Sequence, residues 1–273
     1  MPAGVKHCAV LGSPIAHSLS PVMHRVAYAE LGLDWSYEAV EVDESGLATF
    51  LAGLDADWRG LSLTMPLKRV ALDLVDRCSE VATAVGAVNT IVLGPDEGRG
   101  TGDNTDVPGA LAALREHGLD DLRTARIIGG GATATSIGHA LATAGVTDLE
   151  IVVREVSKAS ATAEAARAAG AHVAVQSLEE PFLEKVDIVV STVPGEAVRS
   201  RLQELVRSAR AVFDVAYEPW PGPIVTAAEQ GGLPAVSGLD LLAHQAALQV
   251  QLMTGSSIEP DLLRKSALAS LLP

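Results

Sequence analysis

The sequence has few cysteines, few basic residues relative to acidic ones, and no long apolar run. It contains only 2 cysteines, Cys8 and Cys78, so neither a disulfide framework nor a zinc-binding spacing is available. Lysine and arginine number 20 against 34 acidic residues, a formal net charge of -14. This argues against nucleic acid as a partner, because phosphate binding needs a basic face. No apolar run approaches the roughly 18 residues of a membrane span, so we expect a cytoplasmic protein without a membrane partner.

The apolar pattern predicts an α/β protein. Hydrophobic residues make up 48% of the 273-residue chain, enough for one or two buried cores. Short Val/Ile/Leu runs alternate with Ala-rich stretches, which is typical of mainly parallel sheets. A first series has expected strands at 6–11, 36–42, 60–64 and 88–93, with helices at 21–32, 44–53, 66–75 and 78–85. A second series has a helix at 106–117 and then strands at 125–128, 149–153, 172–175, 187–191 and 211–215 with helices between them. Two last helices are expected at 239–254 and 259–271.

Lys68 closes the run Gly-Leu-Ser-Leu-Thr-Met-Pro-Leu-Lys, in which an apolar strand ends at a proline. A strand that ends at Thr64 and then turns places Thr64 and Lys68 near the same mouth. A site built in this way sits on a rigid element. For a lysine taken alone, a solvated position in the first turn of a helix remains the alternative.

A glycine-rich turn opens the second series, where the strand at 125–128 runs into Gly129-Gly130-Gly131-Ala132-Thr133-Ala134. Glycines at 129 and 131 permit a tight turn and the close approach of a pyrophosphate, which then meets the N–H groups at a helix start. Ala134 stands where the third glycine of the dinucleotide fingerprint often sits. A plain strand-to-helix turn is the alternative, but the surrounding βα units favour a bound dinucleotide.

The end of the next strand selects between NAD and NADP. An acidic residue there accepts the ribose hydroxyls of NAD, whereas an arginine meets the 2′-phosphate of NADP. The chain has Arg154, Glu155 and Lys158 after Val153, and the two cations favour NADP. Glu155 argues for NAD if it points inward and is neutral to the choice if it is solvated. We therefore predict NADP, with NAD as the alternative.

Three polar clusters in the first series are candidates for a substrate pocket. Ser18 and Ser20 lie just ahead of a helix, where their hydroxyls could receive a carboxylate, although either serine could simply cap the helix. Thr64 with Lys68 forms the second cluster. The third is the run Gly-Ala-Val-Asn-Thr that contains Asn89, followed by Gly-Asp-Asn-Thr-Asp, which ends at Asp106.

The ordered motifs resemble the shikimate dehydrogenase family over nearly the whole chain. The matching pieces are GSPIAHSLSP, SLTMPLK, GAVNT, DNTD followed by Gly109, the glycine-rich turn, and SGLDLLAHQA at 237–246. The resemblance implies a substrate-binding and catalytic α/β domain formed by residues 1–105 with 239–273. It also implies an NADP-binding domain of Rossmann type, with a doubly wound parallel sheet, at 106–238. The implied activity is the reversible, NADP-linked oxidation of shikimate to 3-dehydroshikimate in chorismate and aromatic amino-acid biosynthesis, by a monomer or homodimer.

The resemblance also implies roles for individual residues. Lys68 and Asp106 would flank the reacting hydroxyl, with Lys68 as a positioned cation and proton relay that Asp106 orients. Substrate contacts would be Ser18 and Ser20 to the carboxylate, Thr64, Asn89 and Gln245 to ring hydroxyls, and Tyr217 from the cofactor side. Cofactor contacts would be Gly129, Gly130, Gly131, Ala132, Thr133, Val153, Arg154, Glu155, Lys158, Val215 and Gly238, with Glu80 as a weaker candidate. His17 and His244 are interpreted as structural, and no metal site is expected.

Several positions depart from the family pattern. Arg25 and Ser62 each stand where an asparagine is usual, and Leu241 replaces a methionine expected near the nicotinamide. Val153 and Glu155 replace an asparagine and a threonine beside Arg154, which bears on the choice of cofactor. The alternatives are therefore an NAD-linked quinate/shikimate dehydrogenase, a non-catalytic dinucleotide-binding paralogue, and a methylene-tetrahydrofolate dehydrogenase-like enzyme. The paired serines at 18 and 20 favour shikimate over quinate.

Overall fold

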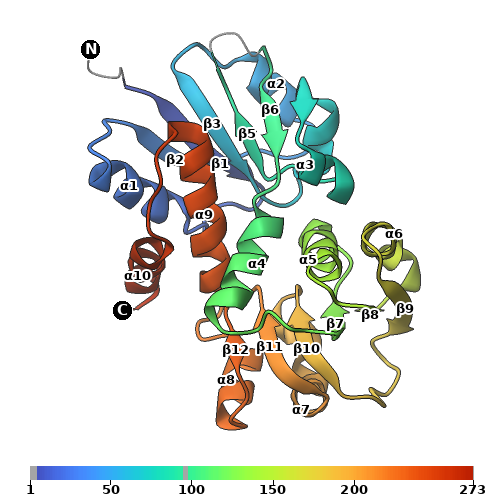
Figure 1. The fold of residues 1–273 in the computed structure, drawn as a ribbon. Coiled ribbons are helices and arrows are strands. Elements are labelled where there is room, and N and C mark those ends of the chain that lie inside the picture. Colours follow the sequence, from blue (N-terminus) through green and yellow to red (C-terminus); the bar gives the residue numbers. More distant parts are fainter. Residues whose placement is uncertain (1–4, 95–97, 273) are drawn as a thin grey trace. The chain divides into compact units, whose positions relative to one another are not determined.

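The computed structural model of the chain describes residues 5–94 and 98–272. It divides into two compact units, each built around one six-stranded sheet (Figure 1). The first unit comprises residues 1–105 and 242–273, and the second comprises residues 106–241. The chain leaves the second unit at 241/242, inside a helix, whereas the sequence placed this boundary at 238/239.

The first unit contains six strands and five α-helices within the described residues, counting one helix that begins in the second unit. Its strands are β1 (His7–Gly12), β2 (Ser36–Glu41), β3 (Trp58–Leu63), β4 (Arg77–Cys78), β5 (Thr90–Val92) and β6 (Thr101–Asp103). Its helices are α1 (Ser20–Glu30), α2 (Leu47–Ala52), the 3-10 helix η1 (Val70–Asp73), α3 (Glu80–Val85), α9 (Gly238–Thr254) and α10 (Pro260–Leu271).

The sheet of the first unit is mixed, with one antiparallel strand. Its strand order is β2-β1-β3-β5-β6-β4. Strands β1, β2 and β3 are parallel, but β5 is antiparallel to both β3 and β6. Strand β4 is parallel to β6, so three of the five pairings among the described residues are parallel and the sheet is mainly parallel, as predicted, with β5 as the antiparallel strand.

Both faces of this sheet are covered. One face buries Leu11, Leu61 and Ile91 in a cluster with α2 and the segment around Leu67. On the other side, α1 contacts α10, and the Tyr28 hydroxyl on α1 lies 3.9 Å from the sulfur of Met253 on α9. The C-terminal helices therefore complete the first unit.

One expected helix of the first unit, 66–75, was wrong. Residues 65–69 form turns, and only η1 is helical in that stretch. The Leu67 N–H donates to the Thr64 carbonyl at 2.9 Å, and the Lys68 carbonyl accepts the Val88 N–H at 2.7 Å. In a continuous α-helix, the Lys68 carbonyl would accept an N–H from the next turn of that helix. Here it accepts the N–H of Val88, in a neighbouring segment, instead.

The second unit alternates strands and helices. Its strands are β7 (Thr124–Ile128), β8 (Asp148–Val153), β9 (His172–Ser177), β10 (Val186–Ser191), β11 (Ala209–Asp214) and β12 (Ala235–Val236). Its helices are α4 (Asp106–Glu116), α5 (Ala132–Thr143), η2 (Val156–Ala159), α6 (Ser160–Ala168), η3 (Gly195–Arg201), α7 (Leu202–Arg207) and α8 (Pro223–Gln230).

All strands of the second sheet are parallel, in the order β12-β11-β10-β7-β8-β9. Numbered from β7 and read from the β9 edge, this is the order 3-2-1-4-5-6 of the dinucleotide-binding fold. The predicted α/β class with a doubly wound sheet is confirmed. The order reverses between β7 and β10, so the carboxyl ends of these two strands mark the position where such folds bind ligands.

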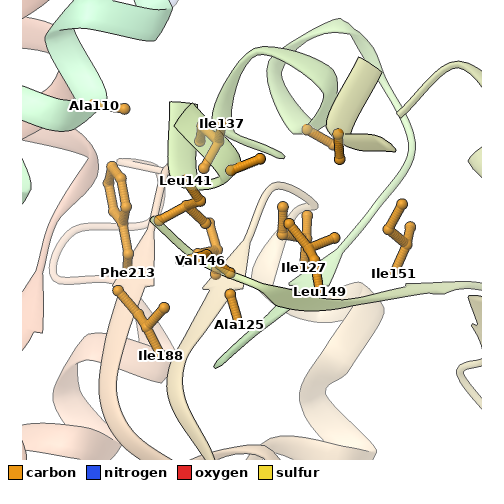
Figure 2. Close-up of a cluster of buried hydrophobic side chains, with 14 of the residues drawn as sticks. Ala110, Ala125, Ile127, Ile137, Leu141, Val146, Leu149, Ile151, Ile188 and Phe213 are labelled. Atoms are coloured by element: carbon orange, nitrogen blue, oxygen red, sulfur yellow. The ribbon is translucent and has the colours of Figure 1, made fainter. Parts of the chain in front are cut away.

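Helices cover both faces of this sheet. On one face, Ile127, Ile151 and Phe213 pack with Ile137 and Leu141 of α5 (Figure 2). On the other face, α7 and α8 cover the β10-β11-β12 half of the sheet. The helix expected between β9 and β10 is missing, because residues 178–185 connect these strands without one.

No helix within residues 5–94 and 98–272 combines the length and the apolar character needed to span a bilayer.

Candidate active site

The Thr64–Lys68 turn leaves β3 in the centre of the first sheet. The Thr64 N–H donates to the Leu11 carbonyl at 2.9 Å, so the turn is tied to β1 as soon as β3 ends. The Met65 carbonyl accepts the Ser13 N–H at 3.1 Å and anchors the tip. Thr64 and Lys68 are both partly buried. The turn is thus held by backbone bonds on both sides, which keeps its two polar side chains on a rigid support.

Ser18 and Ser20 bracket the start of α1. Ser20 is the first residue of the helix, and its N–H donates to the Ser18 hydroxyl at 3.3 Å. Ser18 therefore provides a weak cap, which is the alternative role that the sequence left open. Leu19 occupies the N-cap position without a side-chain bond. Ser18 is partly exposed and Ser20 is buried. Pro21 follows Ser20 and has no N–H, and the Met23 N–H donates to the Leu19 carbonyl at 3.3 Å, so the two hydroxyls are the polar groups that this helix start offers.

Asn89 and Gln245 belong to one buried cluster that also includes Thr105. The Asn89 amide oxygen accepts the Thr105 N–H at 2.8 Å, and its amide nitrogen donates to the Thr105 hydroxyl at 3.0 Å. The Thr105 hydroxyl lies 3.4 Å from the Gln245 side-chain oxygen. Since all three residues are less than 9% exposed, their amide and hydroxyl groups are oriented by one another rather than by solvent.

Asp106 and Glu80 both begin helices, but their surroundings differ. Asp106 follows Thr105 directly, is the first residue of α4 and is buried. Glu80 is the first residue of α3 in the first unit and is exposed, while Ser79 caps that helix by accepting the Ala82 N–H at 3.1 Å. A carboxylate at a helix start is favoured by the helix dipole in both cases.

The three glycines after β7 play different structural parts. A Cβ on Gly129, whose φ is +121°, would overlap the Thr192 hydroxyl that follows β10, and a Cβ on Gly130 would overlap the Lys158 carbonyl. Gly131 has open space where a Cβ would stand, and it precedes α5. The turn therefore lies at the point where the strand order reverses, with room beside the helix start. These features fit the pyrophosphate of a dinucleotide.

The first turn of α5 continues this site. Ala132 and Thr133 are partly exposed, whereas Ala134 is buried against the sheet. Ala134 thus serves the close helix-to-sheet packing for which the fingerprint uses its third small residue.

The residues after β8 are arranged as a charged loop. Val153 is buried, and Arg154, Glu155 and Lys158 are exposed. The Lys158 ammonium pairs with the Glu155 carboxylate at 3.1 Å. Glu155 therefore faces solvent and a neighbouring cation. Because the Lys158 carbonyl packs on Gly130, this charged loop adjoins the glycine turn.

The segment after β11 carries Val215 and Tyr217. A Cβ on Gly238 would overlap the Val215 backbone, so glycine is required where α9 begins. Burial raises the pKa of the Tyr217 phenol, and the nearby Glu218 carboxylate adds to that shift. Burial also raises the pKa of Asp214 to about 6, although the Ala216 N–H donates to this carboxylate at 3.2 Å.

The structure gives physical roles to the positions that depart from the family pattern. Arg25 donates to the Tyr37 carbonyl at 2.9 Å and so covers the backbone of the edge strand β2. Leu241 lies in the hydrophobic core of the second unit. Ser62 bonds to Tyr37 and Gln249 in the interior of the first unit.

Tyr37, Thr105 and Gln249 surround the candidate substrate residues but were not selected from the sequence. Gln249 follows Gln245 by four residues, which places both amides on one face of α9. In the sequence, the signal that could have identified Gln249 was a second amide residue on an otherwise apolar helix face. His17 is exposed and His244 is partly buried.

Two family models match the chain. Residues 10–91 match the model described as the shikimate dehydrogenase substrate binding domain. Residues 112–218 match the model described as shikimate / quinate 5-dehydrogenase. Together these segments cover more than half of the chain, one in each unit.

Individual relatives agree with these matches over nearly the full length. A protein of Citrifermentans bemidjiense named shikimate dehydrogenase (NADP(+)) is 35% identical, and the match covers 97% of this chain and 95% of that protein. The crystal structure of Mycobacterium tuberculosis shikimate dehydrogenase has a TM-score of 0.87 and 34% identity, covering 97% and 99% of the two chains. A Thermus thermophilus shikimate 5-dehydrogenase solved with NADP(H) and shikimate has a TM-score of 0.83 and 32% identity, covering 97% and 100%. The resemblance seen in the sequence is confirmed, and the chain belongs to the shikimate dehydrogenase family.

Proposed function

We propose that the chain catalyses the reversible, NADP-linked oxidation of shikimate to 3-dehydroshikimate, a step in chorismate and aromatic amino-acid biosynthesis. The observation that carries this proposal is the buried cluster of Asn89, Thr105 and Gln245 in the same unit as the Thr64–Lys68 turn. A polyhydroxylated ring is recognised by oriented neutral donors and acceptors of this kind.

The proposed substrate contacts divide by chemistry. Ser18 and Ser20 receive the carboxylate, because two hydroxyls at the positive end of a helix dipole stabilise an anion without a full positive charge. Thr64, Asn89 and Gln245 bind ring hydroxyls. Tyr217 is a further proposed substrate contact. Local donors matter here because the chain's net charge of -14 disfavours an anionic ligand at long range.

Lys68 and Asp106 carry the proposed chemistry. Bound NADP⁺ would supply the acceptor for the hydride of the alcohol carbon. The hydroxyl proton must leave at the same centre, so negative charge develops on the oxygen. Lys68 stabilises that oxygen through its ammonium and relays the proton, and Asp106 orients both groups. In the reverse direction, Lys68 returns the proton to the carbonyl oxygen.

The second unit is proposed to hold NADP through its glycine turn and its charged loop. We assign the N–H groups of Gly130, Gly131, Ala132 and Thr133 to the pyrophosphate, and Arg154 and Lys158 to the 2′-phosphate. Gly129 shapes the turn. Val153, Val215 and Gly238 line the remaining surface. Glu155 pairs with Lys158 and so reduces, without abolishing, the positive charge offered to the phosphate. Glu80 is the weaker proposed contact.

The test is a spectrophotometric assay of purified, folded protein with shikimate or quinate and with NADP or NAD at equal concentrations. We expect the highest kcat/KM for shikimate with NADP. Higher kcat/KM with NAD would support the NAD-linked quinate/shikimate alternative. Binding of dinucleotide without any reduction would support a non-catalytic paralogue and end the proposal.

A further inference from the structure

A row of buried hydrogen bonds crosses the first unit through Gln249. The Tyr37 hydroxyl on β2 donates to the Ser62 hydroxyl on β3 at 2.6 Å. The Ser62 hydroxyl in turn donates to the side-chain oxygen of Gln249 on α9 at 2.8 Å. Burial raises the pKa of the Tyr37 phenol, and hydrogen bonds to Ser62 and Ser20 oppose that shift. This end of the row therefore reaches one of the serines proposed for the substrate carboxylate.

The row continues from Gln249 into the proposed substrate cluster. The Gln249 side-chain nitrogen donates to the Thr90 hydroxyl at 3.0 Å and to the Asn89 carbonyl at 3.2 Å. The Thr90 hydroxyl donates to the Asn89 side-chain oxygen at 2.8 Å. From Asn89 the bonds pass to Thr105 and on to Gln245. From Tyr37 through Ser62, Gln249 and Thr90 to the Asn89 side-chain oxygen, each group donates to the next, so these bonds polarise one another cooperatively.

The orientation of the Gln249 amide is determined by its neighbours. The Asn89 backbone carbonyl can only accept a hydrogen bond, so the Gln249 nitrogen must lie on that side and its oxygen must face Ser62. The Thr90 hydroxyl oxygen accepts a hydrogen bond from the Gln249 nitrogen, and its O–H therefore donates to the Asn89 side-chain oxygen. Gln249, Ser62 and Thr90 are at most 3% exposed, so water does not replace a lost partner easily.

We propose that Gln249 is a positioning residue for shikimate binding, which holds the amide of Asn89 in its binding orientation through Thr90. The proposal rests on the proposed function, because Asn89 and Gln245 are taken as substrate contacts. It also accounts for Ser62. The family pattern has an asparagine at this position, and here the shorter serine hydroxyl lies 2.8 Å from an amide supplied by α9 instead.

Removing the Gln249 amide tests this role directly. Gln249→Met keeps the side-chain volume, and Gln249→Ala removes the side chain beyond Cβ. Each should raise the KM for shikimate about tenfold, because the Thr90 hydroxyl and the Asn89 carbonyl lose a buried donor. The KM for NADP should stay unchanged. Gln251→Ala is the matched control, since this glutamine lies on the same helix and is exposed; it should change neither constant.

A compensating substitution separates positioning from general destabilisation. In the double variant Ser62→Asn/Gln249→Ala, the asparagine on β3 supplies a side-chain amide to the space left by the truncated glutamine. We expect this double variant to recover most of the lost shikimate affinity, although it does not restore the volume that Gln249→Ala removes. No recovery, together with a KM raised equally for both substrates, would show that Gln249 acts only through stability.

A measurement without substrate tests whether Gln249 positions Asn89 even if the proposed function fails. The Asn89 side-chain amide signal in a nitrogen-proton NMR spectrum, assigned by its loss in Asn89→Ser, should shift in Gln249→Met and not in Gln251→Ala. A parent protein that does not oxidise shikimate refutes the proposed function, and this signal then still decides whether Gln249 positions Asn89. If a folded Gln249→Met variant keeps the parent's KM for shikimate, with or without a shifted signal, the proposal is overturned.

Discussion

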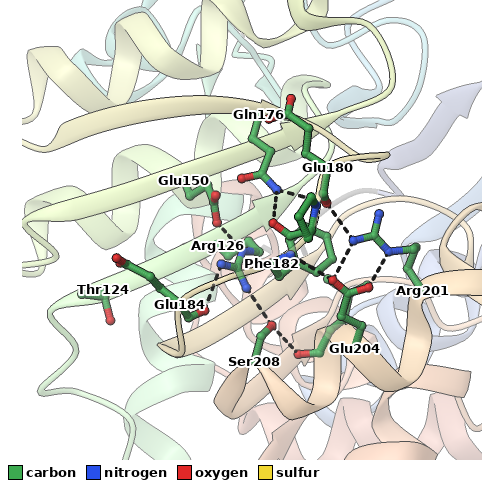
Figure 3. A network of polar contacts seen from close by, with 12 residues as sticks. Thr124, Arg126, Glu150, Gln176, Glu180, Phe182, Glu184, Arg201, Glu204 and Ser208 are labelled. Carbon is green, nitrogen blue, oxygen red and sulfur yellow. Dashed lines mark hydrogen bonds and ion pairs between the residues drawn. The ribbon is translucent and has the colours of Figure 1, made fainter.

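Two buried polar networks, one in each unit, differ in charge and in what they hold in place. The row through Gln249 in the first unit consists of neutral hydroxyls and amides. The network around Arg126 in the second unit is charged (Figure 3). The Arg126 guanidinium pairs with Glu150 and donates to the Ser208 hydroxyl at 2.7 Å. It also lies 4.6 Å from the centre of the Phe182 ring, and the Arg201 guanidinium lies 4.4 Å from the same ring.

The positions of the two networks explain the difference. The charged network lies toward the amino ends of the parallel strands, since Glu184 precedes β10 and Ser208 precedes β11. The glycine turn is at the carboxyl ends, where such folds bind ligands. Arg126 and Arg201 hold residues 178–185, the connection without a helix, by donating to the Glu184, Leu178 and Glu180 carbonyls. The charged network is therefore structural.

The neutral network suits a site for an anionic polyol. Its groups carry no charge that would repel the substrate carboxylate, and hydroxyls and amides do not titrate near neutral pH. The comparison shows that the second unit uses a charged network to fasten a loop, whereas the first unit uses a neutral network to orient the amides proposed to contact the substrate. It predicts that changes in the first unit's site alter turnover, whereas changes at Arg126 alter stability.

The largest expected effect is on turnover. Lys68→Met removes the cation proposed to stabilise the reacting oxygen, and kcat should fall about 1000-fold. The neighbouring Arg69 is exposed, so Arg69→Met is the matched control and should keep kcat within about twofold. Steady-state kinetics with shikimate and NADP, together with thermal unfolding, measure both. A kcat within a few-fold of the parent would remove Lys68 from the chemistry.

The next effect is on stability. Arg126→Met leaves Glu150 without its partner and releases the Ser208 hydroxyl, so the free energy of unfolding should fall by about 3 kcal/mol. At temperatures where the variant is folded, the KM for shikimate should match that of the parent. Arg123→Met removes an exposed pair with Asp121 and should cost at most about 0.5 kcal/mol. Chemical denaturation measures both values, and a large change in the KM for shikimate would contradict the structural role.

The sequence predicted the elements whose patterns are strong. The Val/Ile/Leu runs located β1, β8 and β11, and the glycine turn was placed correctly between β7 and α5. The short strands β4 and β12 are only two residues long and leave no periodic signal. The bonds that Gln249 itself makes link residues 159 to 187 positions apart, so no local pattern contains them. Motif residues such as Asn89 were visible from the family resemblance, but the groups that orient them required the fold.

A buried carboxylate outside both networks shows what charge costs without a strong partner. Burial raises the pKa of Asp214 to about 6 from an ordinary value of 3.8. The folded state therefore binds this proton more tightly than the unfolded state. The contribution of Asp214 to stability is most favourable below about pH 4, falls as pH rises toward 6, and stays low above it.

Asp214→Asn removes this titration. At each pH, the free energy of unfolding of the variant is compared with that of the parent. This difference should be about 2 kcal/mol larger, in favour of the variant, at pH 8 than at pH 4. The difference between the two pH values cancels any fixed cost of the amide. Urea unfolding at both pH values provides the measurement. An equal effect of Asp214→Asn at pH 4 and pH 8 would contradict a raised pKa.

The smallest expected effect concerns the exposed pair Glu155–Lys158, which contrasts with the buried pair at Arg126. Glu155→Gln removes a carboxylate beside the proposed 2′-phosphate contact and frees Lys158 from its 3.1 Å pairing. Exposed charges contribute at most about 1 kcal/mol, so the ratio of kcat/KM for NADP to that for NAD should rise about fivefold. Glu164→Gln, exposed on α6, should leave the ratio unchanged. Because the interaction is exposed, the gain should shrink as salt concentration rises. An unchanged or lower ratio at low salt would show that Glu155 does not influence the choice between the two dinucleotides.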